Sequence, residues 1–341
     1  MTLTILGCGN LGLAILSGIL DSISQQTNQS AAPSAESPDS SEATSKESKS
    51  TTSSDGSDAL SQTPTKFIAC VRRPESAKRI EDAVARYPSV AGDVKVMQNQ
   101  NVKGVEAADV VILGCKPYMI ADILREPGMQ DALAGKLLIS ICAGVPVDQI
   151  SDALYRTPYA MIFDNTDIPN PCNLCRVMPN TAALVRESMT VIATSNPSLP
   201  DHYQKLTDWI FTCVGKIVHL PPAQMDVSTA LCGSGPAFLA LYLEALADGA
   251  VAMGLPRADA QFMAAQTMRG TAGLVLNGEH PALLREKVCT PGGCTNGGLI
   301  ELEEGGVRGV VNRCIRRTTV VASQLGKGAS GVNGMVVGSN A

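Results

Sequence analysis

Three glycines near the N-terminus have a spacing that suits phosphate binding. The segment ILGCGNLG places Gly7, Gly9 and Gly12 in a G-x-G-x-x-G pattern, after a predicted strand and at the start of a predicted helix. The first glycine permits a tight turn, the second lets the backbone approach a pyrophosphate, and the third allows close helix–strand packing. An anion is then favoured by the N-terminus of the helix. We therefore predict a dinucleotide site formed by Gly7, Cys8, Gly9, Asn10, Leu11 and Gly12, the alternative being a glycine turn that binds nothing.

Two arginines follow the second predicted strand, at the position that distinguishes the two nicotinamide cofactors. An acidic residue there accepts a hydrogen bond from the ribose of NAD, whereas this chain reads CVRRPES, with Arg72 and Arg73 at the turn. Guanidinium groups suit a 2′-phosphate, so the sequence favours NADPH, with NADH as the other candidate. Two solvated arginines without a ligand are the plainer alternative.

Two further segments lie at predicted strand ends. GCKP follows the strand DVVIL and includes Cys115, Lys116 and Pro117, while ICAGV ends the next strand and includes Ala143 and Gly144. The carboxyl ends of parallel strands share the edge of the sheet where nucleotides lie. We therefore expect these residues to bind the cofactor, with small side chains leaving room for a flat ring. Lys116 as a simple strand-end charge is the alternative.

The loop CTPGGCTNGG, residues 289–298, interrupts a segment that otherwise reads as helix. It carries two glycine pairs and two threonines but no charge. Such a run is either a plain connection between helices or a set of backbone N–H groups arranged to receive an anion.

The elements that position these motifs change in type along the chain. Strands and helices alternate through residues 1–221, which predicts a Rossmann-type α/β domain with a parallel sheet. Within it, residues 24–65 have almost no large apolar side chain, so we predict that this Ser-rich insert is disordered. Residues 222–326 read as an all-α domain with helices at 226–253, 256–277, 281–288 and 297–325. Residues 327–341 read as a loose tail.

Composition excludes several classes of partner. The net charge is −5 with no Lys- or Arg-rich run, and aromatic residues make up 4%, so we expect no nucleic-acid partner. The apolar stretch 237–255 carries Glu244 and Asp248, so it is predicted to be an interior or interface helix, with no membrane partner. No signal peptide is recognised, and scattered cysteines favour reduced thiols in the cytoplasm.

Cys172 and Cys175 form a single C-x-x-C. Zinc needs two further ligands, and the sequence has no second C-x-x-C and no H-x₃-H. We therefore predict no metal site and interpret the two cysteines as surface-loop thiols.

The basic residues of the helical part indicate whether the group that accepts a hydride is a carbonyl or an imine. Reduction of a carbonyl leaves an alkoxide and needs a general acid, as in the β-hydroxyacid dehydrogenases, which use a lysine of the second domain. No lysine lies between Lys216 and Lys287, and the histidines of that stretch are His219 and His280. A protonated imine is already an electrophile and becomes a neutral amine. The missing lysine therefore favours an imine substrate over a carbonyl.

Seven motifs, taken in order, are similar to those of the pyrroline-5-carboxylate reductases. They are ILGCGNLG, GCKP, SICAGV, RVMPNT (176–181), TALCGSGPAF (229–238), MGLPR (253–257) and TPGGCTNGGLIELEEGG (290–306). The resemblance covers nearly the whole chain outside residues 24–65 and the tail. It implies an oxidoreductase that reduces the cyclic imine 1-pyrroline-5-carboxylate to L-proline with NAD(P)H, the last step of proline biosynthesis. It also implies a homodimer, or a larger homo-oligomer, formed through the helical domains.

The resemblance also implies roles for individual residues. The TPGGCT loop would hold the substrate carboxylate through Thr290, Gly292, Gly293, Cys294 and Thr295, and Thr295 would hydrogen-bond the ring nitrogen. Glu279 matches a family glutamate near the substrate, and Asn101 would lie near the adenosine ribose. In such dimers the loop would complete a site with the partner's nucleotide domain. A catalytically weak, nucleotide-sensing scaffold is a third hypothesis, against which the intact loop argues.

Overall fold

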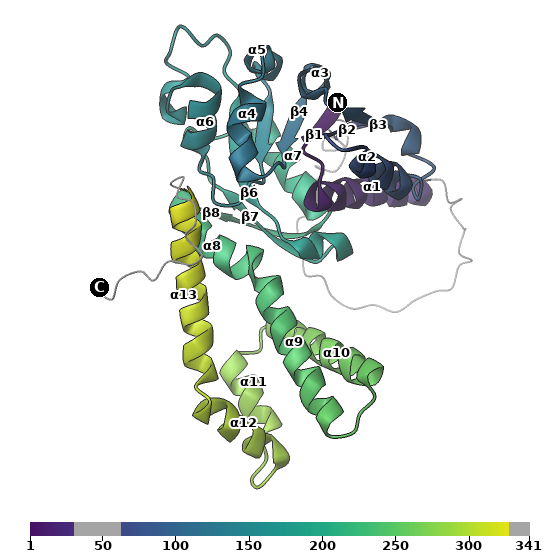
Figure 1. Ribbon diagram of the computed structural model, residues 1–341, viewed down its shortest axis with the longest axis vertical. Coiled ribbons are helices and arrows are strands. Elements are labelled where there is room, and N and C mark those ends of the chain that lie inside the picture. The colour runs from purple at the N-terminus through teal and green to yellow at the C-terminus, as the bar shows by residue number, and fades with distance from the viewer. Residues whose placement is uncertain (31–62, 327–341) are drawn as a thin grey trace, which may run out of the picture. The chain divides into compact units, whose positions relative to one another are not determined.

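The computed structural model describes residues 1–30 and 63–326. The chain divides into two compact units, Met1–Met225 and Asp226–Ala341 (Figure 1). Most of the predicted disordered insert, residues 31–62, and the predicted loose tail, residues 327–341, lie outside the described residues.

The described residues of the first unit form one eight-stranded sheet with the order β3-β2-β1-β4-β5-β6-β7-β8. The strands are β1 (Thr2–Leu6), β2 (Lys66–Val71), β3 (Val94–Gln98), β4 (Val110–Leu113), β5 (Leu137–Ser140), β6 (Asn173–Met178), β7 (Ser188–Ala193) and β8 (Gly215–Leu220). All neighbours pair in parallel except β6 and β7. The predicted Rossmann-type parallel sheet is confirmed, and its antiparallel pair involves β6, a strand that was not predicted. The connection from β6 to β7 is too short for a crossover helix that would return the chain to the same edge.

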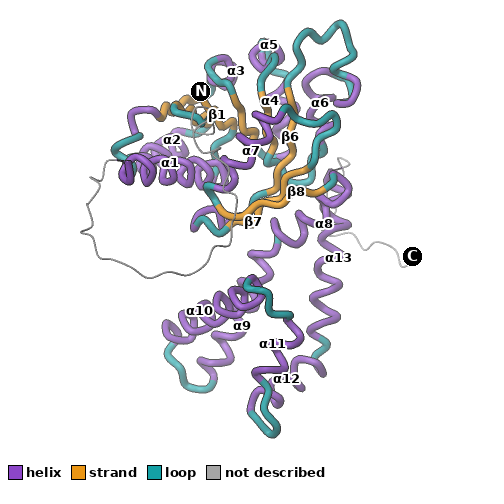
Figure 2. Tube along the Cα trace, turned by 180° about the vertical axis from the view of Figure 1, so that it is seen from behind, coloured by secondary structure: helices purple, strands orange, loops and turns teal. Residues whose placement is uncertain are grey.

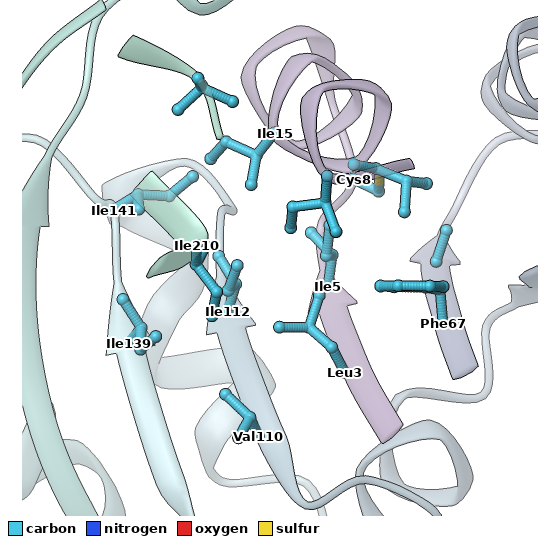
Figure 3. Packing of buried hydrophobic residues seen from close by; sticks show 14 of the residues in the cluster. Leu3, Ile5, Cys8, Ile15, Phe67, Val110, Ile112, Ile139, Ile141 and Ile210 are labelled. Carbon is cyan, nitrogen blue, oxygen red and sulfur yellow. The ribbon is translucent and has the colours of Figure 1, made fainter. Parts of the chain in front are cut away.

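Helices cover both faces of this sheet (Figure 2). One face carries α1 (Asn10–Ser30), α2 (Pro74–Val84) and α7 (Asp201–Thr212), and the other carries α3 (Asn101–Glu106), α4 (Ile120–Leu124), α5 (Met129–Leu133) and α6 (Val147–Tyr155). Alternate residues of each strand enter the two cores, so Val110 and Ile112 pack on the α1 side while Val111 and Leu113 pack on the α4 side. Strands buried on both faces read as unbroken apolar runs. Figure 3 shows Ile5, Ile112 and Ile139 on neighbouring strands near Ile15 and Ile210.

The first helix is longer than the sequence pattern predicts. The disordered insert was predicted to begin at residue 24, yet α1 continues to Ser30, so residues 24–30 of the predicted insert are helical. The Gln25 side chain donates to the Asp21 carboxylate at 2.8 Å, four residues back on the same helix face. Such pairs stabilise a helix by bringing side chains four residues apart into contact.

The described part of the second unit is all helical. It contains the end of α8 (Met225–Ser228), a π-helical turn η7 (Thr229–Gly233), α9 (Gly235–Ala252), α10 (Arg257–Leu276), α11 (Pro281–Val288), α12 (Cys294–Glu304) and α13 (Val307–Gly326). The single helix predicted for residues 297–325 is wrong, because Gly306, with φ +64°, separates α12 from α13. An α/β domain followed by an all-α domain is confirmed as the fold class.

The helical unit exposes much apolar surface. Its buried apolar side chains among the described residues are small, namely Ala230, Ala247, Ala260 and Ala322. Large apolar side chains are exposed to solvent instead, including Leu241 and Leu246 on α9 and Phe262, Met263 and Leu276 on α10. An apolar surface of this extent marks a site of association.

Candidate cofactor and substrate sites

The glycine-rich turn joins β1 to α1 with little spare room. The backbone N–H groups of Gly7 and Cys8 both donate to the carbonyl of Cys70, each at 3.1 Å, and Gly9 N–H donates to Gly7 O at 2.7 Å. Gly7 has φ +72°, and a Cβ placed on it would lie 2.9 Å from the Cα of Cys115. At Gly9 the nearest atom to such a Cβ would be 3.9 Å away. Gly7 is therefore required by the turn, whereas Gly9 leaves space over the backbone for a ligand.

A side chain that sequence reasoning missed lies at the same turn. Arg79, on the exposed side of α2, donates from Nη1 to Asn10 Oδ1 at 2.6 Å. Asn10 is the first residue of α1, so a guanidinium group is held at the helix N-terminus that follows the glycines. Nothing local in the sequence indicates this contact, because it joins helices from two different βα units.

The other predicted nucleotide residues follow strands β2 and β3. Arg72 and Arg73 are exposed, and the carbonyl of Arg73 accepts from the N–H groups of Ser76 and Ala77 as α2 begins. Asn101 opens α3, and its side chain donates to Glu126 Oε1 at 2.7 Å. Since β2 and β3 are parallel neighbours, these residues lie at the carboxyl edge of the sheet.

The ends of β4 and β5 contribute to that edge as well. Lys116 is exposed and precedes a short 3₁₀ helix, Pro117–Met119, while Ala143 is exposed and Gly144 has φ +75°. Cys115 lies directly against the Gly7 turn. The predicted residues of the first unit thus follow β1, β2, β4 and β5, together with Asn101 after β3, and this edge has the backbone space and positive charge that a dinucleotide needs.

The TPGGCT loop is the beginning of α12. We predicted that the helix would start at residue 297, but α12 begins at Cys294, with Gly293 as its N-cap. Gly292 has φ +69°, Gly293 N–H donates to Thr290 O at 2.9 Å, and Asn296 Nδ2 donates to the same carbonyl at 2.8 Å. The first N–H groups of a helix lack partners within the helix, so those of Cys294 and Thr295 can serve an anion.

Comparison with known proteins was informative over nearly the full length of the chain. Residues 222–325 match the family model described as pyrroline-5-carboxylate reductase dimerisation, and residues 50–144 match the model described as NADP oxidoreductase, coenzyme F420-dependent. The chain is 56% identical to a pyrroline-5-carboxylate reductase of Lophium arboricola over 98% of this chain and 96% of that protein. This chain belongs to the pyrroline-5-carboxylate reductase family.

Other pyrroline-5-carboxylate reductases agree with this membership. The enzyme of Neurospora crassa is 48% identical over 98% of this chain and 96% of its own length. A solved Plasmodium falciparum pyrroline carboxylate reductase with NADP bound shares the fold, with a TM-score of 0.68 and 21% identity over 96% of this chain and 98% of that one. The predicted family and the predicted enzyme class, an oxidoreductase, are confirmed.

Glu279 lies in the helical unit of this reductase family member, just before α11. Its carboxylate receives two contacts from Lys287 Nζ, at 2.6 and 2.7 Å. The neighbouring His280 caps α11 by accepting from Ala282 N–H at 3.3 Å. Glu279 is therefore an anion with a cationic partner on the helix that leads into the TPGGCT loop.

The interpretation of Cys172 and Cys175 as surface-loop thiols was wrong. Cys175 lies within β6, a strand that we did not predict, and both side chains are buried. Burial raises the pKa of each of these thiols to about 12. Among the described residues, no group of three or more His, Cys, Asp or Glu side chains is placed to hold a metal ion.

One described segment, Pro222–Ala252, is long and apolar enough to cross a membrane by length and composition. It contains the π-helical turn η7 and three acidic side chains, Asp226, Glu244 and Asp248. It also begins the region that matches the reductase dimerisation model. An apolar helix in that region has a second explanation, which is contact between subunits.

Proposed function

We propose that this protein reduces 1-pyrroline-5-carboxylate to L-proline with NADPH, as the last step of proline biosynthesis. Residues 1–221 form the nucleotide domain of this proposal, and residues 222–326 form the dimerisation and substrate domain. One observation carries the substrate assignment. In a member of this family, an uncharged glycine-rich loop opens directly into the N-terminus of α12 at Cys294. This loop receives a carboxylate without contributing a charged side chain of its own.

NADPH fits the carboxyl edge of the sheet. Gly9 leaves space for the pyrophosphate, and the N-terminus of α1 and the guanidinium of Arg79 supply positive charge there. Arg72 and Arg73 then suit the 2′-phosphate, while Asn101 serves the adenosine ribose. When bound, the reduced nicotinamide supplies a hydride, and Ala143 and Gly144 leave room for its ring. The preference for NADPH over NADH rests on the two arginines.

The substrate residues act by orientation and charge. The N–H groups of Cys294 and Thr295 and the Thr290 hydroxyl hold the carboxylate. Gly293, whose own N–H donates to the Thr290 carbonyl, leaves the Thr290 hydroxyl uncovered, and the left-handed backbone of Gly292 shapes the turn. The Thr295 hydroxyl hydrogen-bonds the ring nitrogen and orients the imine carbon for attack. Glu279 favours the protonated, electrophilic imine through its negative charge, and Lys287 holds it in place. Since a neutral amine forms, no strong general acid is required.

The same proposal includes a homodimer, or a larger homo-oligomer, in the cytoplasm. The open apolar side chains of α9 and α10 are best covered by the helical domain of a second copy. All eleven cysteines are free thiols, which is typical of a reducing compartment. A membrane or nucleic-acid partner is not part of this proposal.

The test is an NADPH-oxidation assay with the full chain and 1-pyrroline-5-carboxylate. Absorbance follows NADPH loss, and mass spectrometry identifies proline formed in equal amount. A panel of β-keto acids serves as the carbonyl control and is expected to give no turnover. Turnover of those acids instead of the imine would support a carbonyl dehydrogenase. NADPH binding without any turnover would support the nucleotide-sensing scaffold.

A further inference from the structure

Two cysteines face each other across the ends of neighbouring strands. In the parallel pair β4–β5, Leu113 is registered opposite Ser140, and Cys115 and Cys142 each lie two residues further on. Cys142 Sγ is 3.3 Å from the carbonyl oxygen of Cys115 and 3.4 Å from that of Leu113. Neighbouring strands are about 4.8 Å apart. That spacing falls within the roughly 4.4–6.8 Å between Cα atoms that a disulfide spans.

The two thiols interact with each other and are partly open. A hydrogen bond between them raises the pKa of Cys115 and lowers that of Cys142. Cys142 is buried, but Cys115 is only half-buried, so a small reagent can reach the pair. Cys8 and Cys70 differ, because both are buried and burial raises the pKa of each to about 12. Among these four thiols, Cys115 and Cys142 combine proximity with access.

We propose that Cys115 and Cys142 are a redox modification site that forms a reversible disulfide on reaction with a hydroperoxide. One sulfur of the pair attacks a peroxide oxygen, the O–O bond breaks, and a sulfenic acid and water form. The second sulfur then forms the S–S bond, and the hydroxyl leaves as a second water with the remaining thiol proton. Two thiols lose two electrons, and one hydrogen peroxide is reduced to two waters. A dithiol reductant reverses the modification.

The modification would act on cofactor binding, a consequence that rests on the proposed function. The backbone of Cys115 lies against the Gly7 turn, where a Cβ on Gly7 would be 2.9 Å from Cys115 Cα and N. Cys142 directly precedes Ala143 and Gly144, where we place the nicotinamide. A bond between the two sulfurs fixes the positions of the ends of β4 and β5 beneath that ring. We expect the disulfide to weaken NADPH binding, and bound NADPH to slow formation of the disulfide.

The first test needs neither cofactor nor substrate. The reduced full chain is treated with hydrogen peroxide, the remaining thiols are blocked, and peptides are mapped by mass spectrometry before and after dithiothreitol. We expect a dithiothreitol-sensitive link between the peptides of Cys115 and Cys142. The separate variants Cys115→Ser and Cys142→Ser should each lack it, while Cys314→Ser, in α13, should retain it. Sulfinic acid on Cys115 without a link, or a link between Cys8 and Cys70 instead, would overturn the proposal.

The second test measures NADPH affinity by fluorescence titration of the oxidised and reduced chain. We expect the disulfide to raise Kd about tenfold, a change that corresponds to about 1.4 kcal/mol. Each single variant, compared with its own untreated form, should show no peroxide-dependent change in Kd. A link that leaves NADPH affinity unchanged would refute the effect on the cofactor. A chain that forms the link but does not reduce the imine would refute the proposed function and leave the disulfide site standing.

Discussion

Arg79 Nη1 lies 2.6 Å from Asn10 Oδ1, in a contact between residues 69 positions apart in the sequence. Asn10 is the first residue after the glycine-rich turn, so the contact holds a positive charge beside the site proposed for the pyrophosphate. The charge of Arg79 also affects the pKa of Cys8, a residue of the turn. Burial raises the pKa of the Cys8 thiol to about 12, and the nearby Arg79 opposes that rise.

Replacing Arg79 tests the role of this contact. We expect Arg79→Ala to raise the KM for NADPH and for NADH by a similar factor of about three to ten, because the pyrophosphate is common to both cofactors. Steady-state kinetics with both cofactors provide the measurement. Lys78→Ala, which removes an exposed charge from the same helix, is the matched control and should change KM less. An effect on NADPH alone would instead place Arg79 at the 2′-phosphate.

Arg72 and Arg73 should produce the opposite pattern. Changing both to Ala is expected to raise the KM for NADPH far more than that for NADH, because only NADPH carries the 2′-phosphate. The loss for NADPH should be about tenfold or more, since two charge-assisted hydrogen bonds are removed. Equal changes for the two cofactors would refute the assignment.

Substitutions at Gly7 and Gly9 should separate an effect on folding stability from an effect on NADPH binding. Gly7→Ala forces a Cβ onto a residue with φ +72° and into the backbone of Cys115, so we expect it to destabilise the first unit by about 1–3 kcal/mol. Gly9→Ala has open space and should leave the free energy of unfolding nearly unchanged while weakening NADPH binding. Urea unfolding and fluorescence titration measure the two quantities. Full NADPH affinity in Gly9→Ala would argue against a pyrophosphate at this position.

Thr295 tests the substrate loop. Thr295→Val keeps the side-chain shape but removes the hydroxyl, and the lost hydrogen bond to a charged nitrogen should cost about 1.5–3 kcal/mol of transition-state stabilisation. The value of kcat/KM for the imine should therefore fall by about tenfold to somewhat over a hundredfold. NADPH affinity should stay unchanged, because the nucleotide residues belong to the other unit. Unaltered turnover, or an equal loss of NADPH affinity, would contradict the role of Thr295.

If the apolar surface of α9 lies in the subunit contact, a charged side chain placed on α9 should weaken the dimer. Leu246 is 57% exposed, and Leu246→Glu should shift the chain from dimer towards monomer by placing a carboxylate in the proposed subunit contact. Light scattering coupled to gel filtration measures the change. Leu184→Glu, at a comparably exposed leucine of the first unit, is the control and should remain dimeric. Identical masses for the two variants would locate the subunit contact elsewhere.

Features that contiguous residues encode could be predicted from the amino-acid sequence. The G-x-G-x-x-G spacing predicted a turn between strand and helix, and Gly7 and Gly12 lie where that pattern requires them. Apolar runs predicted most strands, since a strand covered on both faces buries every side chain. The ordered motifs also identified the family. Local periodicity did not reveal β6, because residues 157–175 lack a clear strand pattern, so Cys172 and Cys175 were placed on the surface.

Contacts between residues far apart in the sequence could be seen in the folded chain alone. The contact of Arg79 with Asn10 depends on how α2 lies beside α1, and the pairing of Cys115 with Cys142 depends on the order and register of β4 and β5. The first residue of α12 could not be predicted from the sequence either. The glycines and the threonine of residues 293–297 are compatible with a loop as well as with a helix N-terminus. Such choices depend on sheet order, packing and hydrogen bonds across the chain, which no short segment contains.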